Sequence, residues 1–93
     1  MYLAVLTLEL DIAHALSLKD KRRAIRSVRD RIAHRWNVSI AETGLQDVLR
    51  HAVFSVAMVG SDHGYVEGAL AKIVDFVRTV PQVDLDDYSI NFV

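Results

Sequence analysis

The hydrophobic and polar positions of this 93-residue chain follow two different periods. Residues 2–12, 37–43 and 83–93 alternate with the two-residue period of a β-strand, and 51–59 is apolar on both faces, as a central strand is. Between the strands, apolar residues recur at three, four and seven positions, which is typical of amphipathic helices. The first helix has the stripe Leu18, Ile25, Val28, Ile32 and Trp36, and the second has Val66, Ala69, Leu70, Ile73, Val74 and Val77.

Capping residues mark where each helix should begin and end. Ser17 can cap the first helix, and Asp20 stands at the acidic position of a capping box. Asp62 can cap the second helix, which should stop near Pro81. Residues 44–50 are expected to form a loop or a short helical turn.

The predicted order of elements is β-α-β-β-α-β, which indicates an α+β sandwich of the ferredoxin-like type. We expect one domain over residues 1–93, with both helices on one face of a four-stranded antiparallel sheet. The third strand should lie between the first two, and the fourth should pair with the free side of the first. A shift of alternation within the last strand predicts a β-bulge near Asp86 and Asp87. This fold has many unrelated functions, so the fold alone does not indicate one.

The alternation also predicts which side chains cover each face of the sheet. The helix-facing set should be Leu6, Leu8, Leu10, Ile40, Phe54 and Val56. The open face should then carry Leu3, Val5, Thr7, Ser39, Ala41, Val53, Ser55 and Ala57. This face has no central aromatic residue, so base stacking of the kind found in RRM domains is not expected. Together with a hydrophobic content of 52%, it predicts a homo-oligomer, most simply a dimer, joined through the open sheet face or an edge strand.

Composition narrows the remaining classes of function. The chain has no cysteine, which excludes disulfides and thiolate metal sites and fits a cytoplasmic location. It has no apolar run long enough for a membrane span, and its first residues read as a strand rather than a signal peptide. No phosphate loop, serine elbow or zinc signature is present, so we expect neither an enzyme nor a cofactor. The histidines lack metal-ligand spacing, and a metal site is not expected: they are His14, His34, His51 and His63.

Positive charge is concentrated in one segment of the chain. Residues 17–35 hold eight of the eleven Lys and Arg residues and only two acids, a net charge of +6 in a chain of net charge −1. On a helical wheel, Lys19, Arg22, Arg23, Arg26 and Arg29 share one flank, whereas Arg31 and Arg35 lie on the other side. Several of these charges occupy the first turns of the helix, where the macrodipole disfavours them.

Two groups could compensate this charge. The predicted topology brings Glu9, Asp11, Glu42, Asp84 and Asp86 to the end of the sheet at which the basic helix begins, with His51 near Glu9. Mutual neutralisation by weak surface ion pairs is one interpretation. The other is an anionic partner that binds the helix.

Three short stretches resemble the successive motifs of the YlxP-like family of small bacterial proteins. They are Leu18-Lys-Asp-Lys-Arg22, Asn37-Val-Ser-Ile-Ala-Glu42 and Gln46-Asp47, in the family's order and spacing. The resemblance implies a ferredoxin-like fold and, because such proteins are often encoded beside transcription and ribosome-maturation genes, an association with RNA. It implies no reaction. One departure is Leu49, where the family commonly has tryptophan, so no role of that ring is carried over.

The functional hypothesis from the sequence is binding of structured RNA, most simply ribosomal RNA or a ribosomal subunit, through the phosphate backbone. The alternative is a homo-oligomeric interaction module that has no nucleic-acid partner. We call the charged end of the sheet, where the basic helix begins, the rim. The predicted rim residues carried by the family motif are Glu42, Gln46 and Asp47. The predicted nucleic-acid-binding residues are Lys19, Lys21, Arg22, Arg23, Arg26 and Arg29.

Overall fold

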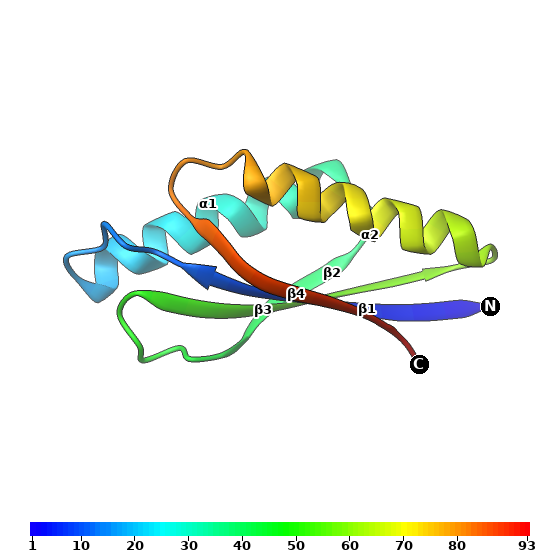
Figure 1. Ribbon diagram of the computed structural model, residues 1–93, viewed down its shortest axis with the longest axis horizontal. Helices are drawn as coiled ribbons and strands as arrows, with labels where there is room; N and C mark the ends of the chain where they lie inside the picture. The colour runs from blue at the N-terminus through cyan, green and yellow to red at the C-terminus, as the bar shows by residue number, and fades with distance from the viewer.

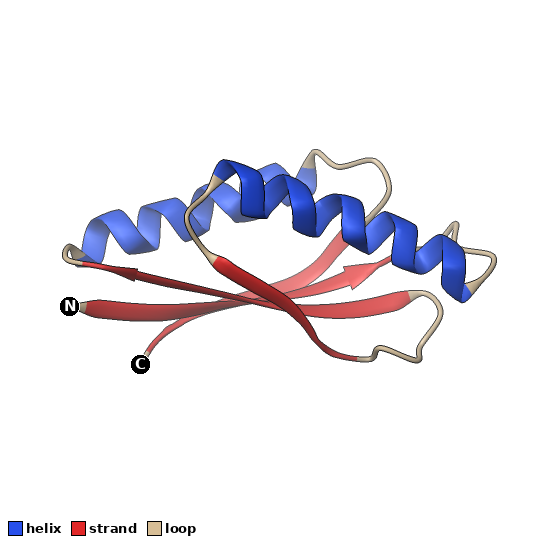
Figure 2. Ribbon diagram, turned by 180° about the vertical axis from the view of Figure 1, so that it is seen from behind, coloured by secondary structure: helices blue, strands red, loops and turns tan.

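The computed structural model describes residues 1–93 and confirms the predicted order of strands and helices. The sheet has the strand order β2-β3-β1-β4 with all neighbours antiparallel, and both helices lie on one side of it (Figures 1 and 2). The protein is therefore a ferredoxin-like α+β sandwich. Its elements are β1 (Tyr2–Asp11), α1 (Leu18–Arg35), β2 (Ser39–Gly44), β3 (His51–Gly60), α2 (His63–Arg78) and β4 (Asp84–Phe92).

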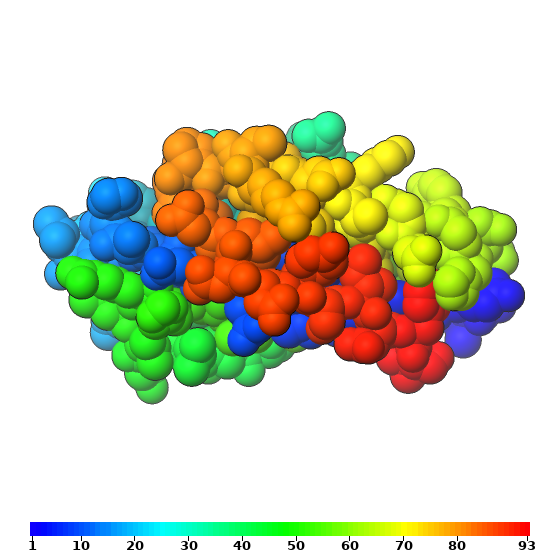
Figure 3. Space-filling view, viewed as in Figure 1, coloured from blue at the N-terminus to red at the C-terminus, as the bar shows by residue number.

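The two helices cover different halves of the sheet. α1 lies closest to the edge strand β2, and α2 packs over β1, β3 and β4. Viewed from the side of Figure 1, α2 and β4 form the front surface and α1 lies behind them, as the space-filling view also shows (Figure 3). Neither helix is both long enough and apolar enough to span a membrane.

The predicted faces of the sheet are confirmed by burial. Leu6, Leu8, Leu10, Phe54 and Val56 lie beneath the helices and are at most 1% exposed. Ile40 faces the same way but is only half-buried, because β2 is a short edge strand. Every predicted open-face residue is half-buried or exposed: Leu3, Val5, Thr7, Ser39, Ala41, Val53, Ser55 and Ala57.

Both predicted helix caps are present. The Ser17 hydroxyl accepts a hydrogen bond from the Asp20 backbone N–H at 3.1 Å, and the Asp62 carboxylate accepts one from the Tyr65 N–H at 2.7 Å. The Asp20 carboxylate reaches back to the backbone N–H of Leu16 at 3.1 Å, one residue before the cap. Each helix start thus has side-chain acceptors for otherwise unpaired amide groups.

Two β-bulges shift the register of strand pairing in the sheet. Glu9 pairs with Asp87 and Leu10 pairs with Leu85, so Asp86 is the extra residue and the predicted bulge is confirmed. A second bulge at Thr43 was not predicted from the sequence, because β2 is too short for a change of alternation to be visible. Both bulges lie at the end of the sheet that faces the start of α1.

Candidate nucleic-acid interface

A row of five basic side chains runs along the exposed side of α1. All five are exposed, and they recur at helical spacing over eleven residues, a length of about 15 Å along the helix axis. Four of them line a shallow outer groove with Ser27 and Asp30. We call this row the basic face; it comprises Lys19, Arg22, Arg23, Arg26 and Arg29.

The basic face has few counter-charges within the protein. Only Arg29 has a carboxylate within 4.0 Å, namely that of its neighbour Asp30, at 3.1 Å. Lys19, Arg22, Arg23 and Arg26 form no ion pair. The acids at this end of the sheet therefore do not neutralise the basic face.

Lys21 does not belong to the basic face, which corrects its assignment as a nucleic-acid-binding residue. It is 1% exposed. Its ammonium donates to the backbone carbonyls of Leu45 and Val48, both at 2.6 Å, and to that of Gln46 at 3.3 Å. The physical reason is helical position: Lys21 lies four residues before the buried Ile25, on the apolar stripe, so it points between helix and sheet.

Two of the three rim residues carried by the family motif, Glu42 and Gln46, contact the Lys21 ammonium. Glu42 Oε2 lies 3.3 Å from Lys21 Nζ. Gln46 contributes its carbonyl to that ammonium, and its side-chain amide donates to the Glu42 carbonyl at 3.4 Å. Asp47 is exposed and makes no side-chain hydrogen bond or ion pair. Lys21, Glu42 and Gln46 thus tie the start of α1 to the β2–β3 loop, a structural role that the sequence reasoning missed.

The loop held by Lys21 contains the chain's one non-glycine residue with positive φ, Leu45 at 60°. This left-handed conformation is costly for a residue with a Cβ. It turns the Leu45 carbonyl toward the ammonium, so the hydrogen bond at 2.6 Å offsets part of that cost. The spacing Leu18, Lys21, Ile25 and Val28 is the sequence signal by which the buried lysine could have been found.

A hollow, distinct from the outer groove, lies between α1 and the helix-facing side of β2. Its volume is about 230 Å³. Glu42 and Phe54 are paired partners on β2 and β3, and their side chains are directed to this side of the sheet. The lining consists of Arg22, Ile25, Arg26, Arg29, Glu42 and Phe54.

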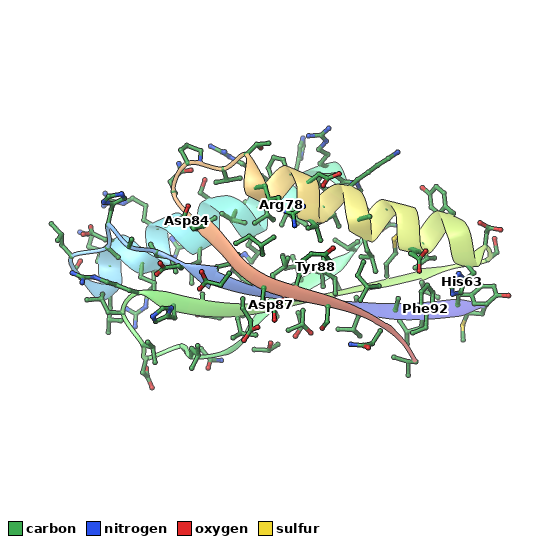
Figure 4. The ribbon with its side chains drawn as sticks, viewed as in Figure 1. His63, Arg78, Asp84, Asp87, Tyr88 and Phe92 are labelled. Atoms are coloured by element: carbon green, nitrogen blue, oxygen red, sulfur yellow. The ribbon has the colours of Figure 1, made fainter.

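The opposite edge of the sheet is acidic. β4 carries Asp84, Asp86 and Asp87, and Figure 4 shows Asp84 and Asp87 along that strand. Arg78 on α2 lies over the ring of Tyr88, with 5.6 Å from its guanidinium carbon to the ring centroid, and forms an ion pair with Asp75. The acidic strand β4 and the strand β2, which lies beside α1, are thus the two opposite edges of the sheet.

The histidines are dispersed in space as well as in sequence. His51 lies 3.8 Å from Asp11 and 4.0 Å from Asp86, rather than near Glu9, whose partners are Val53 and Asp87. His63 stacks on Phe92 with ring centroids 3.9 Å apart, at the other end of the sheet (Figure 4). No group of three or more His, Asp or Glu side chains is arranged to hold a metal ion.

The fold and this surface define a small ferredoxin-like α+β domain with a basic helix along one edge. The family model described as "Protein of unknown function (DUF503)" matches residues 3–90, and the chain belongs to this family. It is also 33% identical over 73 residues to the "Uncharacterized protein YlxP" of Bacillus subtilis (strain 168), an alignment that covers 78% of this chain and 79% of that protein. The predicted resemblance to YlxP-like proteins is thereby confirmed.

Proposed function

We propose that this protein is a binding module, rather than a catalyst, for structured RNA, and that it contacts the phosphate backbone through the basic face of α1. The observation that carries the proposal is the set of four basic side chains, Lys19, Arg22, Arg23 and Arg26, that lie on one exposed helix surface without an ion-pair partner. Like charges held this close repel one another, and an anionic polymer would relieve the repulsion.

The dimensions of the basic face suit a run of phosphates. Its length of about 15 Å along the helix is enough for several successive phosphates of one strand. The positive end of the α1 macrodipole adds a further preference for anions near Lys19. Removing Lys21 from the predicted set leaves five exposed charges, each of which can meet a phosphate.

The chemistry of the basic face favours recognition of shape over sequence. It has no aromatic side chain on which several bases could stack, and the open sheet face has none at its centre. Arg and Lys side chains contact phosphates without reading base identity, and folded RNA presents phosphates in defined arrangements. The overall charge of −1 is compatible with this role because only two of the twelve acids, Asp20 and Asp30, lie on α1.

A titration with matched charge variants tests the proposal. Labelled ribosomal RNA fragments and purified ribosomal subunits are titrated with the protein at one low salt concentration. Arg22→Ala/Arg26→Ala should weaken binding at least tenfold for all RNAs alike. The control Lys72→Ala/Arg78→Ala removes the same charge from α2 and should change affinity by less than threefold. Wild-type binding no tighter than to a neutral polymer, or equal losses in both double variants, would end the proposal.

The second candidate is a homo-oligomeric interaction module without a nucleic-acid partner. It is favoured by the separation of a basic α1 edge from an acidic β4 edge, and by the largely apolar open sheet face. Copies could pack through the open face as a dimer, or join the two edges head to tail. If copies join head to tail through the basic α1 edge, Arg22→Glu/Arg26→Glu would dissociate the assembly in sedimentation experiments. A wild-type sedimentation mass near 10.4 kDa at micromolar concentration would exclude this candidate.

A further inference from the structure

We propose that the hollow between α1 and β2 holds a single unpaired nucleotide of the bound RNA, and that Glu42 selects bases with an exocyclic amino group. This inference rests on the proposed function and adds a base-selective site to it. The geometry that points to it is a carboxylate and a buried aromatic ring beneath three guanidinium groups, in the hollow lined by Arg22, Arg26, Arg29, Glu42 and Phe54.

The size of the hollow fits one ring system. Its volume of about 230 Å³ is below the roughly 300–1,000 Å³ of pockets that hold a drug-sized molecule. Phe54, 1% exposed, and Ile25, 8% exposed, form its apolar part. A base directed into the hollow would contact these apolar atoms and could lie against an arginine plane, as unpaired bases do in RNA complexes.

The arginines link this hollow to the basic face. Arg22 and Arg26 line both the hollow and the outer groove, so a strand that follows the groove reaches the mouth of the hollow. Arg29 lines the hollow alone, and Arg23 lines the groove but not the hollow. A nucleotide whose phosphate lies between Arg22 and Arg26 therefore has its base next to the hollow.

Glu42 supplies the selective contact. Its Oε2 is buried at 3.3 Å from Lys21 Nζ, and no side-chain hydrogen bond to Glu42 occurs within the protein. The side chain remains 18% exposed, which leaves Oε1 as the oxygen open to a ligand. A carboxylate oxygen only accepts, so it pairs with the amino group of cytosine, adenine or guanine. Uracil presents a carbonyl at the position of the cytosine amino group and can offer the carboxylate only its ring N3–H, so we expect it to bind more weakly.

The test compares RNA hairpins that share one stem and differ in their loops. Anisotropy titrations at low salt use loops of cytidine, uridine, guanosine or inosine, where inosine lacks the guanine amino group. The cytidine loop should bind about tenfold more tightly than the uridine loop, and guanosine more tightly than inosine by a similar factor. Glu42→Gln should bring both ratios close to one, whereas the control Arg23→Ala should weaken all four loops and leave the ratios unchanged.

A measurement on the wild-type protein makes the test independent of variant folding. The Ile25 methyl resonances should shift on addition of the cytidine hairpin and much less with the uridine hairpin. If the hairpins bind with ratios within twofold and Ile25 is unaffected, the hollow is not a nucleotide site, although RNA binding itself stands. If no hairpin and no ribosomal RNA binds, the proposed function fails and this inference fails with it.

Discussion

Replacing the buried Lys21 by methionine is the most direct way to separate structural from binding roles among the basic residues of α1. Methionine keeps an unbranched side chain of similar length and removes only the ammonium. The variant loses two hydrogen bonds of 2.6 Å to the carbonyls of Leu45 and Val48, a longer one to Gln46, and the contact with Glu42. Glu42 Oε2, which has no hydrogen bond, then has no charged group within 4.0 Å.

The expected loss of stability in Lys21→Met is the difference between opposing contributions. Each hydrogen bond to a charged group contributes about 1.5–3 kcal/mol, and removing one partner of a buried ion pair costs roughly 3–5 kcal/mol. Water can reach the loop carbonyls in the variant because Leu45 and Val48 are 47% and 40% exposed, and methionine avoids the desolvation of an ammonium. We expect a net loss of about 3 kcal/mol in the free energy of unfolding, or a fall in Tm of about 12–24 °C for a domain of this size.

Chemical denaturation and calorimetry measure this loss, with Lys19→Met as the matched control. Lys19 is an exposed residue of the same helix turn, and its replacement should change stability by less than about 0.5 kcal/mol. Lys21→Met should leave RNA affinity unchanged well below its Tm, whereas Lys19→Met should lower it. A Lys21→Met variant as stable as the wild type would refute the structural role of the ammonium.

Three further substitutions test the packing around two glycines and the cap of α1, each by thermal unfolding. Gly68→Ala should stabilise the protein by about 0.5–1 kcal/mol, because a Cβ there meets no atom within 4 Å and α2 gains a better helix former; a fall in Tm would contradict this. Gly60→Ala should destabilise by about 1–3 kcal/mol, since its Cβ would lie 2.7 Å from the Val66 side chain, and an unchanged Tm would show that the strand shifts freely. Ser17→Ala should cost about 1 kcal/mol through loss of the α1 cap, and an unchanged Tm would contradict this role of the Ser17 hydroxyl.

The fold was predictable because its determinants are local and periodic. Alternation identified the buried face of the sheet correctly at Leu6, Leu8 and Phe54, and Ser17 and Asp62 marked the helix starts. Even the bulge at Asp86 was visible, since β4 is long enough for its alternation to shift. The bulge at Thr43 was not visible, because six residues of β2 contain too few alternations.

The candidate site was predictable only in part, because charge alone does not reveal burial. Lys21 has the same residue type as its exposed neighbour Lys19, and its partners are backbone carbonyls 24 to 27 residues away. No sequence pattern identifies a carbonyl as a ligand. The role of Glu42 and the hollow above Phe54 likewise depend on how far α1 lies from an edge strand, which is a property of the packed structure.

The salt dependence of RNA binding tests the central claim most directly, since it counts the phosphates that the protein contacts. With four or five contacts through the basic face, the logarithm of the association constant should fall with the logarithm of salt concentration at a slope of roughly −3 to −4. Arg22→Ala/Arg26→Ala should flatten that slope by about one to two units. A wild-type slope near zero, or the same slope in the wild type and this variant, would contradict phosphate binding by α1.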